Sequence, residues 1–217
     1  MAAARVRSIF IAAGGNAPAA TQMIWLPGAY DSAEHFVQAG FAQAVAQRRL
    51  RMDLRFVDLD MQHLDDRAAL RRLRNEIVLP ACASGASVWL GGISLGGMAA
   101  LDYASCFGGE LEGLCLFAPY LGNRMLIDEI TAAAGLHAWE PGELAEADTE
   151  RRIWRFIQAG AGARPLFLGF GRNDRFAAAH ELLAAALPEA RVNVIDGAHD
   201  WRTWGTLWEE FLDLRIT

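Results

Sequence analysis

The sequence predicts one α/β domain in which helices flank a mostly parallel central sheet of about six or seven strands. Its 217 residues fall within the length of a single domain, and 53% of them are hydrophobic, which is enough for a core on both faces of a sheet. Short runs of β-branched or aromatic residues alternate with longer helical patterns, and this alternation indicates βαβ units. We find no internal repeat and no linker, so we expect residues 1–217 to form a single domain.

The predicted strands are short apolar runs bounded by turn residues. In chain order they cover residues 8–12, 23–26, 54–59, 88–91, 113–117, 165–170 and 192–195. Only about twenty residues precede the second of these runs, which leaves little chain for further strands at the N-terminal edge. We therefore expect a trimmed sheet.

Helical patterns fill most of the intervals between the strands. We expect helices over residues 32–49, 65–79, 95–106, 148–158, 175–186 and 201–214, several of which start beside an acidic or hydroxyl residue suited to capping. Residues 121–147 differ, because they follow one predicted strand and contain no strand of their own. A connection of that length indicates an inserted lid.

Charge and cysteine content narrow the class of protein. The chain has 26 acidic and 20 basic side chains and a formal charge of -6, which lacks the basic excess of a nucleic-acid-binding protein. We therefore expect a small-molecule partner and no nucleic acid.

The chain has three cysteines, Cys82, Cys106 and Cys115. Their odd number and their apolar or small neighbours predict reduced thiols and a cytoplasmic protein.

One uncharged stretch, residues 77–101, is long enough to resemble a transmembrane helix of about 20 residues. Pro80, Ser84 and several glycines divide it, however, into a turn, a short strand and the start of a helix. We expect no integral membrane association.

Near the N-terminus, Arg5 and Arg7 precede an apolar run over residues 9–13. This run is shorter than the apolar core of a signal peptide, so we expect no cleaved signal.

The first motif with chemical content is Gly92-Ile93-Ser94-Leu95-Gly96. It follows a predicted strand and precedes a predicted helix, which is the context that a nucleophile elbow requires. In such an elbow the serine occupies a strained turn, and glycines two residues away on either side let the strand and the helix pass closely. The motif predicts that Ser94 is a nucleophile.

Two other glycine patterns overlap the same residues. Gly92 and Gly97 have the spacing of a phosphate-binding loop, but Met98 stands where that loop needs a lysine, and no dinucleotide-binding fingerprint is present. Gly92 and Gly96 also match the pattern of membrane-helix dimers, which needs an uninterrupted apolar helix. We expect neither a nucleotide nor another cofactor, and no metal.

A serine hydroxyl needs an imidazole base that a carboxylate orients, in the chain order serine, acid, histidine. Among the histidines that follow Ser94, His199 alone lies just beyond a late predicted strand. His180 lies within an alanine-rich helical pattern, and His137 lies in the predicted lid. His199 is therefore the candidate base.

Asp174 is the candidate acid, because it lies in the loop beyond the strand predicted at residues 165–170. It could instead cap the helix that follows, a role that aspartate often fills. Asp196 is the second candidate, although it lies only three residues before His199.

The elbow, Gly171-Arg172-Asn173-Asp174 and Gly197-Ala198-His199-Asp200-Trp201 together resemble the α/β-hydrolase superfamily over most of the chain. The sequence is similar in particular to small esterases, thioesterases and lysophospholipases. The resemblance implies an α/β-hydrolase fold with a small lid, and the roles of nucleophile for Ser94, general base and then acid for His199, and orienting carboxylate for Asp174.

The family usually has a segment beginning His-Gly that supplies part of the oxyanion hole. Leu26-Pro27-Gly28-Ala29-Tyr30 occupies that place here, with proline instead of histidine. Because the hole uses backbone donors, the resemblance implies the amides of Ala29 and Leu95, with that of Tyr30 as the second choice.

The substrate-binding candidates are Tyr30, Met125 and Trp139, the last two from the predicted lid. The apolar residues of the lid could equally anchor it to the domain, because pockets and anchors share this composition. Three functions remain open: a carboxylic ester hydrolase, an acyl thioester hydrolase or acyltransferase with the same three residues, and a non-catalytic binding protein on this fold.

Overall fold

The computed structural model describes residues 5–14, 19–59, 67–145 and 147–214, and within them one sheet has seven strands. The strands lie in the order β1-β3-β2-β4-β5-β6-β7. β1 pairs antiparallel with β3, and every other pairing is parallel, so the predicted fold class is confirmed. The strands are β1 (Ser8–Ile11), β2 (Thr21–Leu26), β3 (Met52–Val57), β4 (Ser87–Ile93), β5 (Gly113–Phe117), β6 (Leu166–Gly171) and β7 (Arg191–Ile195).

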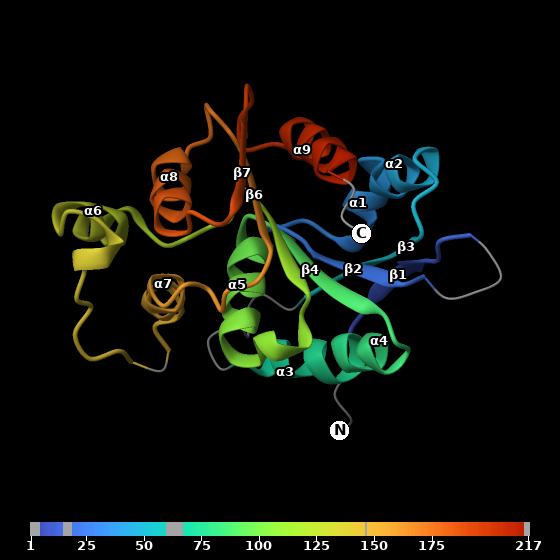
Figure 1. Cartoon of the computed structure of the whole chain (residues 1–217), viewed down its shortest axis with the longest axis horizontal. Coiled ribbons are helices and arrows are strands. Elements are labelled where there is room, and N and C mark those ends of the chain that lie inside the picture. Colours follow the sequence, from blue (N-terminus) through green and yellow to red (C-terminus); the bar gives the residue numbers. More distant parts are fainter. Residues whose placement is uncertain (1–4, 15–18, 60–66, 146, 215–217) are drawn as a thin grey trace.

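Helices cover both faces of the sheet (Figure 1). Figure 1 shows α1, α2 and α9 on one side, and α3, α4 and α5 on the other. The described helices are α1 (Ala33–Gln38), α2 (Phe41–Gln47), α3 (Ala68–Leu73), α4 (Leu79–Ala83), α5 (Leu95–Phe107), α6 (Arg124–Ala132), α7 (Thr149–Gln158), α8 (Ala177–Ala186) and α9 (Trp201–Asp213).

Two predicted helices differ from the structure. The helix expected over residues 32–49 is divided into α1 and α2 at Gly40, whose φ of 81° is left-handed. The helix expected over residues 65–79 begins outside the described residues, at 65–66. Its described part continues from α3 through a π-helical turn, Arg74–Val78, into α4. Pro80 therefore lies within helical backbone, directly after the π-helical turn, and not in the expected turn. Proline has no N–H to continue the regular helical hydrogen bonds, which accounts for a local departure from α-helical geometry here.

An aromatic cluster joins α1, α2 and α9 to the sheet. Trp25 of β2 is fully buried, and its ring centroid lies 4.9 Å from that of Phe117 and 5.3 Å from those of Phe41 and Trp208. Such aromatic pairs contribute about 0.5–1.5 kcal/mol each beyond the burial of their area. The cluster fixes α9, and with it the loop that precedes α9, against the carboxyl half of β2.

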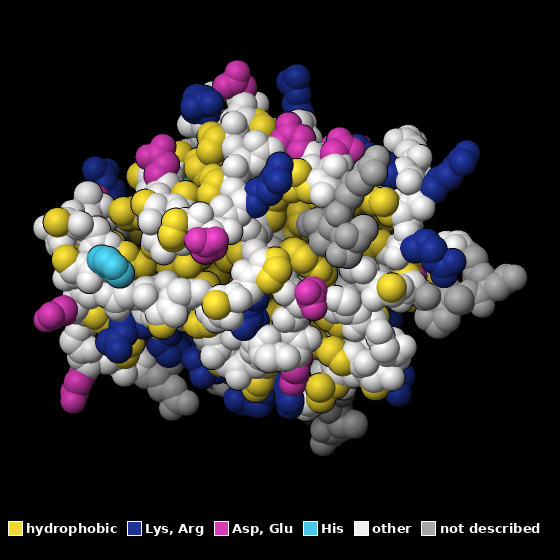
Figure 2. Space-filling view, in the orientation of Figure 1, with side chains coloured by type: hydrophobic (Ala, Val, Ile, Leu, Met, Phe, Trp, Pro, Cys, Tyr) yellow, Lys and Arg dark blue, Asp and Glu magenta, His cyan; other side chains and the backbone are white. Residues whose placement is uncertain are grey.

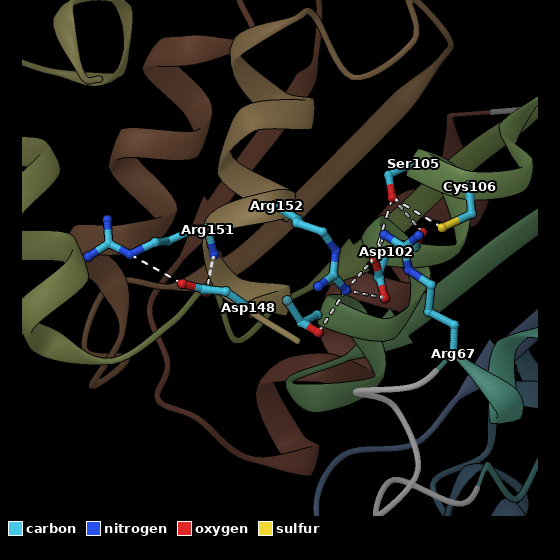
Figure 3. A network of polar contacts seen from close by, with 8 residues as sticks. Arg67, Asp102, Ser105, Cys106, Asp148, Arg151 and Arg152 are labelled. Carbon is cyan, nitrogen blue, oxygen red and sulfur yellow. Dashed lines mark hydrogen bonds and ion pairs between the residues drawn. The ribbon is translucent and has the colours of Figure 1, made fainter. Parts of the chain in front are cut away.

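A buried carboxylate fixes the helix that follows the predicted nucleophile. Asp102 of α5 is 1% exposed and pairs with Arg67 at 3.4 Å and with Arg152 of α7 at 3.5 Å. Figure 3 shows the two guanidinium groups converging on this side chain, while Ser105 donates to the Asp102 backbone oxygen. Because a buried charge is costly unless it is paired, these contacts tie α7 to α5.

The insertion predicted at residues 121–147 contains α6 and connects β5 to α7. Glu129 of α6 pairs with Arg151 of α7, and the indole of Trp154 donates to the Leu121 backbone oxygen at 2.6 Å. In Figure 1, α6 lies at the end of the molecule beyond α7 and α8. The role of this segment as a lid stays a prediction.

Other sequence-based expectations concern the surface and the cysteines. In Figure 2, acidic and basic side chains are interspersed around the rim of the face in view. In the described part of the chain, no helix is both long and apolar enough to cross a membrane. All three cysteines are free thiols. The cytoplasmic location stays a prediction.

Candidate active site

Ser94 lies between β4 and α5, in a turn with the geometry of a nucleophile elbow. Its φ of 52° and ψ of -116° are strained for a non-glycine residue, and its amide donates to the Phe117 backbone oxygen at 3.0 Å. A Cβ atom on Gly92 would lie 2.2 Å from the Gly96 oxygen, and one on Gly96 would lie 2.2 Å from the Leu26 oxygen. Only glycine fits at both places, which explains the motif.

His199 follows β7 and precedes the first turn of α9. Its Nε2 lies 3.0 Å from Ser94 Oγ, and its Nδ1 lies 2.8 Å from Asp174 Oδ2. The imidazole packs nearly perpendicular to the rings of Phe176 and Trp204, with centroids 5.2 and 5.1 Å away. These contacts hold the ring in the orientation that faces both the hydroxyl and the carboxylate.

Asp174 lies in the loop after β6, and this loop is bound to the histidine loop. The amides of Arg172 and Asn173 donate to the backbone oxygens of Ile195 and Gly197, at 2.8 and 2.9 Å. The Asp174 side chain is fully buried, with Oδ2 toward His199 and Oδ1 accepting from the Phe176 amide at 2.8 Å. The carboxylate therefore binds both His199 and the amide of Phe176, the residue at the N-cap of α8, and within the part of the chain that is described it accepts no hydrogen bond from the first turn of the helix.

Burial alone would raise the pKa of Asp174. The hydrogen bonds from His199 and from the Phe176 amide oppose that effect, and the net pKa lies below its usual value. Asp174 is thus ionised at neutral pH and suited to accept the Nδ1 proton of His199. Asp196, the second candidate, has a side chain that is 93% exposed and pairs with Arg172 at 3.4 Å.

The predicted oxyanion segment passes beside the nucleophile. A Cβ on Gly28 would lie 3.5 Å from Ser94 Cβ, and the Asp31 amide closes a turn by donating to the Gly28 oxygen at 3.3 Å. Within the described ranges, neither the Ala29 nor the Leu95 amide donates to another backbone group. The two amides can therefore donate to a substrate oxygen without breaking a hydrogen bond to the backbone.

The structure places the three substrate-binding candidates differently. Tyr30 is fully exposed and has a left-handed φ of 64°, and Met125 is 79% exposed. Trp139 is 2% exposed, and its indole donates to Glu129 at 2.9 Å. In the part of the chain that the structure describes, no recorded contact joins Met125 or Trp139 to Ser94 or His199, so their role in substrate binding stays a prediction.

Two contacts near the site were not predicted from the sequence. His180 of α8 is fully buried, and its Nε2 lies 2.9 Å from the Pro119 oxygen. Its burial lowers its pKa to about 4, so it is neutral at physiological pH. The indole of Trp201 donates to Asp31 Oδ1 at 3.1 Å, joining the histidine loop to the oxyanion segment. The helical pattern around His180 does not reveal its contact with Pro119, and no local pattern identifies the contact between Trp201 and Asp31.

A large cavity lies away from these groups. Its volume is about 540 Å³, and Thr21, Ser87 and Leu166 line it. These are the first residues of β2, β4 and β6, so the cavity is at the opposite edge of the sheet from Ser94. Among the described residues, no three His, Cys, Asp or Glu side chains are grouped as a metal site. The chemically organised site is therefore the carboxyl edge of the sheet.

No protein-family model and no curated protein sequence matches the chain. Its structure is similar to S-formylglutathione hydrolase (FrmB) from Staphylococcus aureus, with a TM-score of 0.66 and 11% identity over 100% of both chains. It is also similar to Est1E from Butyrivibrio proteoclasticus, with a TM-score of 0.70 and 13% identity over 97% of this chain and 94% of that one.

A third similar structure is the esterase PF2001 from Pyrococcus furiosus, with a TM-score of 0.58 and 17% identity over 98% of this chain and 86% of that one. These identities are low, and what the chain shares with the three proteins is the arrangement of its sheet and helices. The chain has the α/β-hydrolase fold.

Proposed function

We propose that this protein is a serine hydrolase that cleaves a carboxylic ester, with Ser94, His199 and Asp174 as its catalytic triad. The observation that carries the proposal is the continuous series of contacts from Asp174 Oδ2 to His199 Nδ1, at 2.8 Å, and from His199 Nε2 to Ser94 Oγ, at 3.0 Å. Three residues on three separate loops meet in the order that proton transfer needs.

In the first half of the reaction, Ser94 Oγ attacks the carbonyl carbon of the ester while His199 Nε2 takes the hydroxyl proton. Asp174, ionised and buried, stabilises the imidazolium that forms. The tetrahedral intermediate then breaks its bond to the alkoxy oxygen, and His199 returns its proton to the departing alcohol. The acyl group stays on Ser94 as an ester.

In the second half, water replaces the alcohol. His199 Nε2 takes a proton from the water, whose oxygen attacks the acyl carbon and forms a second tetrahedral intermediate. Breakdown of this intermediate breaks the bond to Ser94 Oγ, which recovers its proton from His199. The carboxylic acid is released, and the enzyme returns to its starting state.

The negative oxygen of each intermediate needs donors, and we assign the amides of Ala29 and Leu95 to this role. The support is their position, since Leu95 follows the nucleophile directly and Ala29 lies in the turn that passes Ser94. Backbone amides fixed before the reaction stabilise the developing charge without reorganising. Removal of one such donor typically costs about 10²–10³ in kcat.

The acyl group would extend from Ser94 toward the insertion at residues 121–147, for which we retain the role of lid. This segment leaves the carboxyl end of β5, the edge of an α/β sheet where ligands gather. Tyr30, Met125 and Trp139 remain the candidates for contact with the substrate. All three are aromatic or apolar side chains, which suits a small-molecule ester with an apolar acyl group.

The test is steady-state and rapid-mixing kinetics on matched ester and thioester substrates of graded acyl length. With an activated ester, whose acylation step is faster than hydrolysis of the acyl-enzyme, we expect a burst of released alcohol equal to the enzyme concentration, followed by slower turnover. Faster turnover of the thioester than of its matched ester would favour the thioester hydrolase. Absence of turnover across the whole panel would contradict the proposal.

A further inference from the structure

A side-chain hydrogen bond joins the segment that carries the proposed oxyanion donor to the loop that carries the proposed base. Trp201 Nε1 donates to Asp31 Oδ1 at 3.1 Å, across 170 positions of sequence. Asp31 follows Ala29 by two residues, and Trp201 follows His199 by two residues. The bond therefore ends close to both functional groups.

The Trp201 end of this bond is rigid. Trp201 is the first residue of α9, whose cap is Asp200, and its ring packs edge-on against Phe36 and Trp204, with centroids 5.2 and 5.3 Å away. Trp204 in turn packs against the imidazole of His199. The indole N–H is thus fixed relative to the histidine ring by the same aromatic contacts that hold that ring.

The Asp31 end controls a short turn. The Asp31 amide donates to the Gly28 oxygen, and a Cβ on Gly28 would lie 2.8 Å from Asp31 Oδ2, so the carboxylate is folded back over the turn. The side chain is only 17% exposed, and His35 Nδ1 lies 3.3 Å from the oxygen that Trp201 contacts. Ala29 and Tyr30 lie between the two closed ends of this turn.

We infer that Asp31 is a positioning residue of the proposed hydrolase: its bond to Trp201 holds the turn that presents the Ala29 amide in register with His199. The inference rests on the proposed function. Gly28 passes beside Ser94 at one end of the turn, where a Cβ on the glycine would lie 3.5 Å from Ser94 Cβ, and Asp31 is bound to α9 at the other. With both ends held, the turn has little freedom to change the direction of the Ala29 amide. An oxyanion donor works only when it is aimed before the charge develops.

A purely structural role would give a different pattern of effects. If the bond only stabilised the fold, its loss would lower the melting temperature and leave the kinetics of the folded enzyme intact. If it aims the Ala29 amide, its loss would weaken binding of the transition state more than binding of the substrate, so kcat would fall with little change in KM.

The test uses four variants of the full chain. Asp31→Ala removes the acceptor, and Trp201→Phe removes the indole N–H while keeping an aromatic ring at that position. Asp31→Asn keeps an oxygen that can accept from the indole. Asp213→Ala is the matched control, because it removes an exposed carboxylate that ties α9 to Arg48, the C-cap residue of α2.

Each protein is assayed for kcat and KM, for affinity toward a trifluoromethyl ketone that forms a tetrahedral adduct with serine, and for labelling of Ser94 by an organophosphonate. We expect Asp31→Ala and Trp201→Phe each to lower kcat and the affinity for the ketone about 10- to 100-fold, because misplacement by about 1 Å costs that much. The double variant should lose no more than either single one. Asp31→Asn and Asp213→Ala should remain near the wild type.

Other results would overturn the inference. Unchanged kcat in both single variants, a lowered melting temperature alone, or additive losses in the double variant would each show that the bond does not aim the donor. In those cases labelling of Ser94 in the wild type leaves the proposed function intact. Failure of the wild type to be labelled or to turn over any ester contradicts the proposed function, and the inference with it.

Discussion

Replacing Asp174 by asparagine reverses the hydrogen bonding of His199 while keeping the size of the side chain. Asp174 Oδ1 accepts from the Phe176 amide at 2.8 Å, so the oxygen of an asparagine must stay on that side. The NH2 group would then face His199 Nδ1, which lies 2.8 Å from the present Oδ2, and would donate to it. The imidazole proton is forced onto Nε2, 3.0 Å from Ser94 Oγ, where a base is needed.

The expected loss in kcat is about 10³ to 10⁴, the typical effect of the wrong tautomer in a catalytic triad. At about 1.36 kcal/mol for each factor of ten, this corresponds to roughly 4 to 5.5 kcal/mol of transition-state stabilisation. KM should change little, because the Asp174 side chain is fully buried against His199 and so is not accessible to a substrate. Asp196→Asn is the matched control, with a side chain that is 93% exposed.

The assay is the initial rate of hydrolysis of a chromogenic ester at neutral pH, with circular dichroism to show that both variants are folded. A loss of less than about tenfold in Asp174→Asn would refute the assignment of this residue, since the tautomer argument requires far more. A larger loss in Asp196→Asn than in Asp174→Asn would move the acid of the triad to Asp196.

Three further predictions address stability and the substrate site. Burial lowers the pKa of His180 from 6.5 to about 4. As the pH drops through this window the unfolded chain binds the proton before the folded chain does, so the free energy of unfolding falls, by about 3 kcal/mol in total. Urea titrations at pH 7 and pH 4.5 should show a smaller fall in His180→Phe than in the wild type. Gly96→Ala would place a Cβ 2.2 Å from a backbone oxygen, so it should lower both activity and the free energy of unfolding, the latter by about 1–3 kcal/mol. Gly205→Ala, at a position of α9 with open space around it, should instead raise the free energy of unfolding by up to about 1 kcal/mol. Equal effects of the two substitutions would contradict the packing account of the elbow. Trp139→Ala should lower the free energy of unfolding by about 3–5 kcal/mol, because the side chain is buried. If Trp139 and Met125 line the acyl pocket, alanine at either position should also shift the preferred acyl length upward, each added methylene being worth about 0.8 kcal/mol. An unchanged preference in both variants would indicate that the insertion serves only as an anchor.

The sequence was most informative where the signal is local. Ser94 stands between two glycines, and the contacts of the elbow leave no room for a Cβ at either of them. The strand, turn and helix around Ser94 lie within residues 87–107. Asp174 and His199 could be chosen because each follows a predicted strand, and the carboxyl ends of parallel strands meet at one edge.

Contacts between distant segments could not be read in this way. The bond from Trp201 to Asp31 depends on how α9 docks on α1 and on the turn before it. Trp201 belongs to the motif around His199, but that motif does not identify Asp31 as its partner. The predicted helix boundaries were wrong for a related reason. The break at Gly40 and the π-helical turn before Pro80 depend on how each helix packs on the sheet, and the spacing of apolar residues along the sequence does not reveal this packing. Trp139 could be interpreted from the sequence as part of a pocket or as an anchor, and both interpretations remain predictions for a side chain that is 2% exposed.

The central claim is that Ser94 is a nucleophile activated by His199. The most direct measurement is mass spectrometry of the protein after treatment with an organophosphonate, which reacts only with an activated serine. We predict a single adduct on the peptide that contains Ser94, loss of both adduct and turnover in Ser94→Ala, and normal labelling in Ser105→Ala, whose hydroxyl contacts the Asp102 backbone instead. An adduct that persists in Ser94→Ala, or a wild type that is not labelled, would contradict the claim.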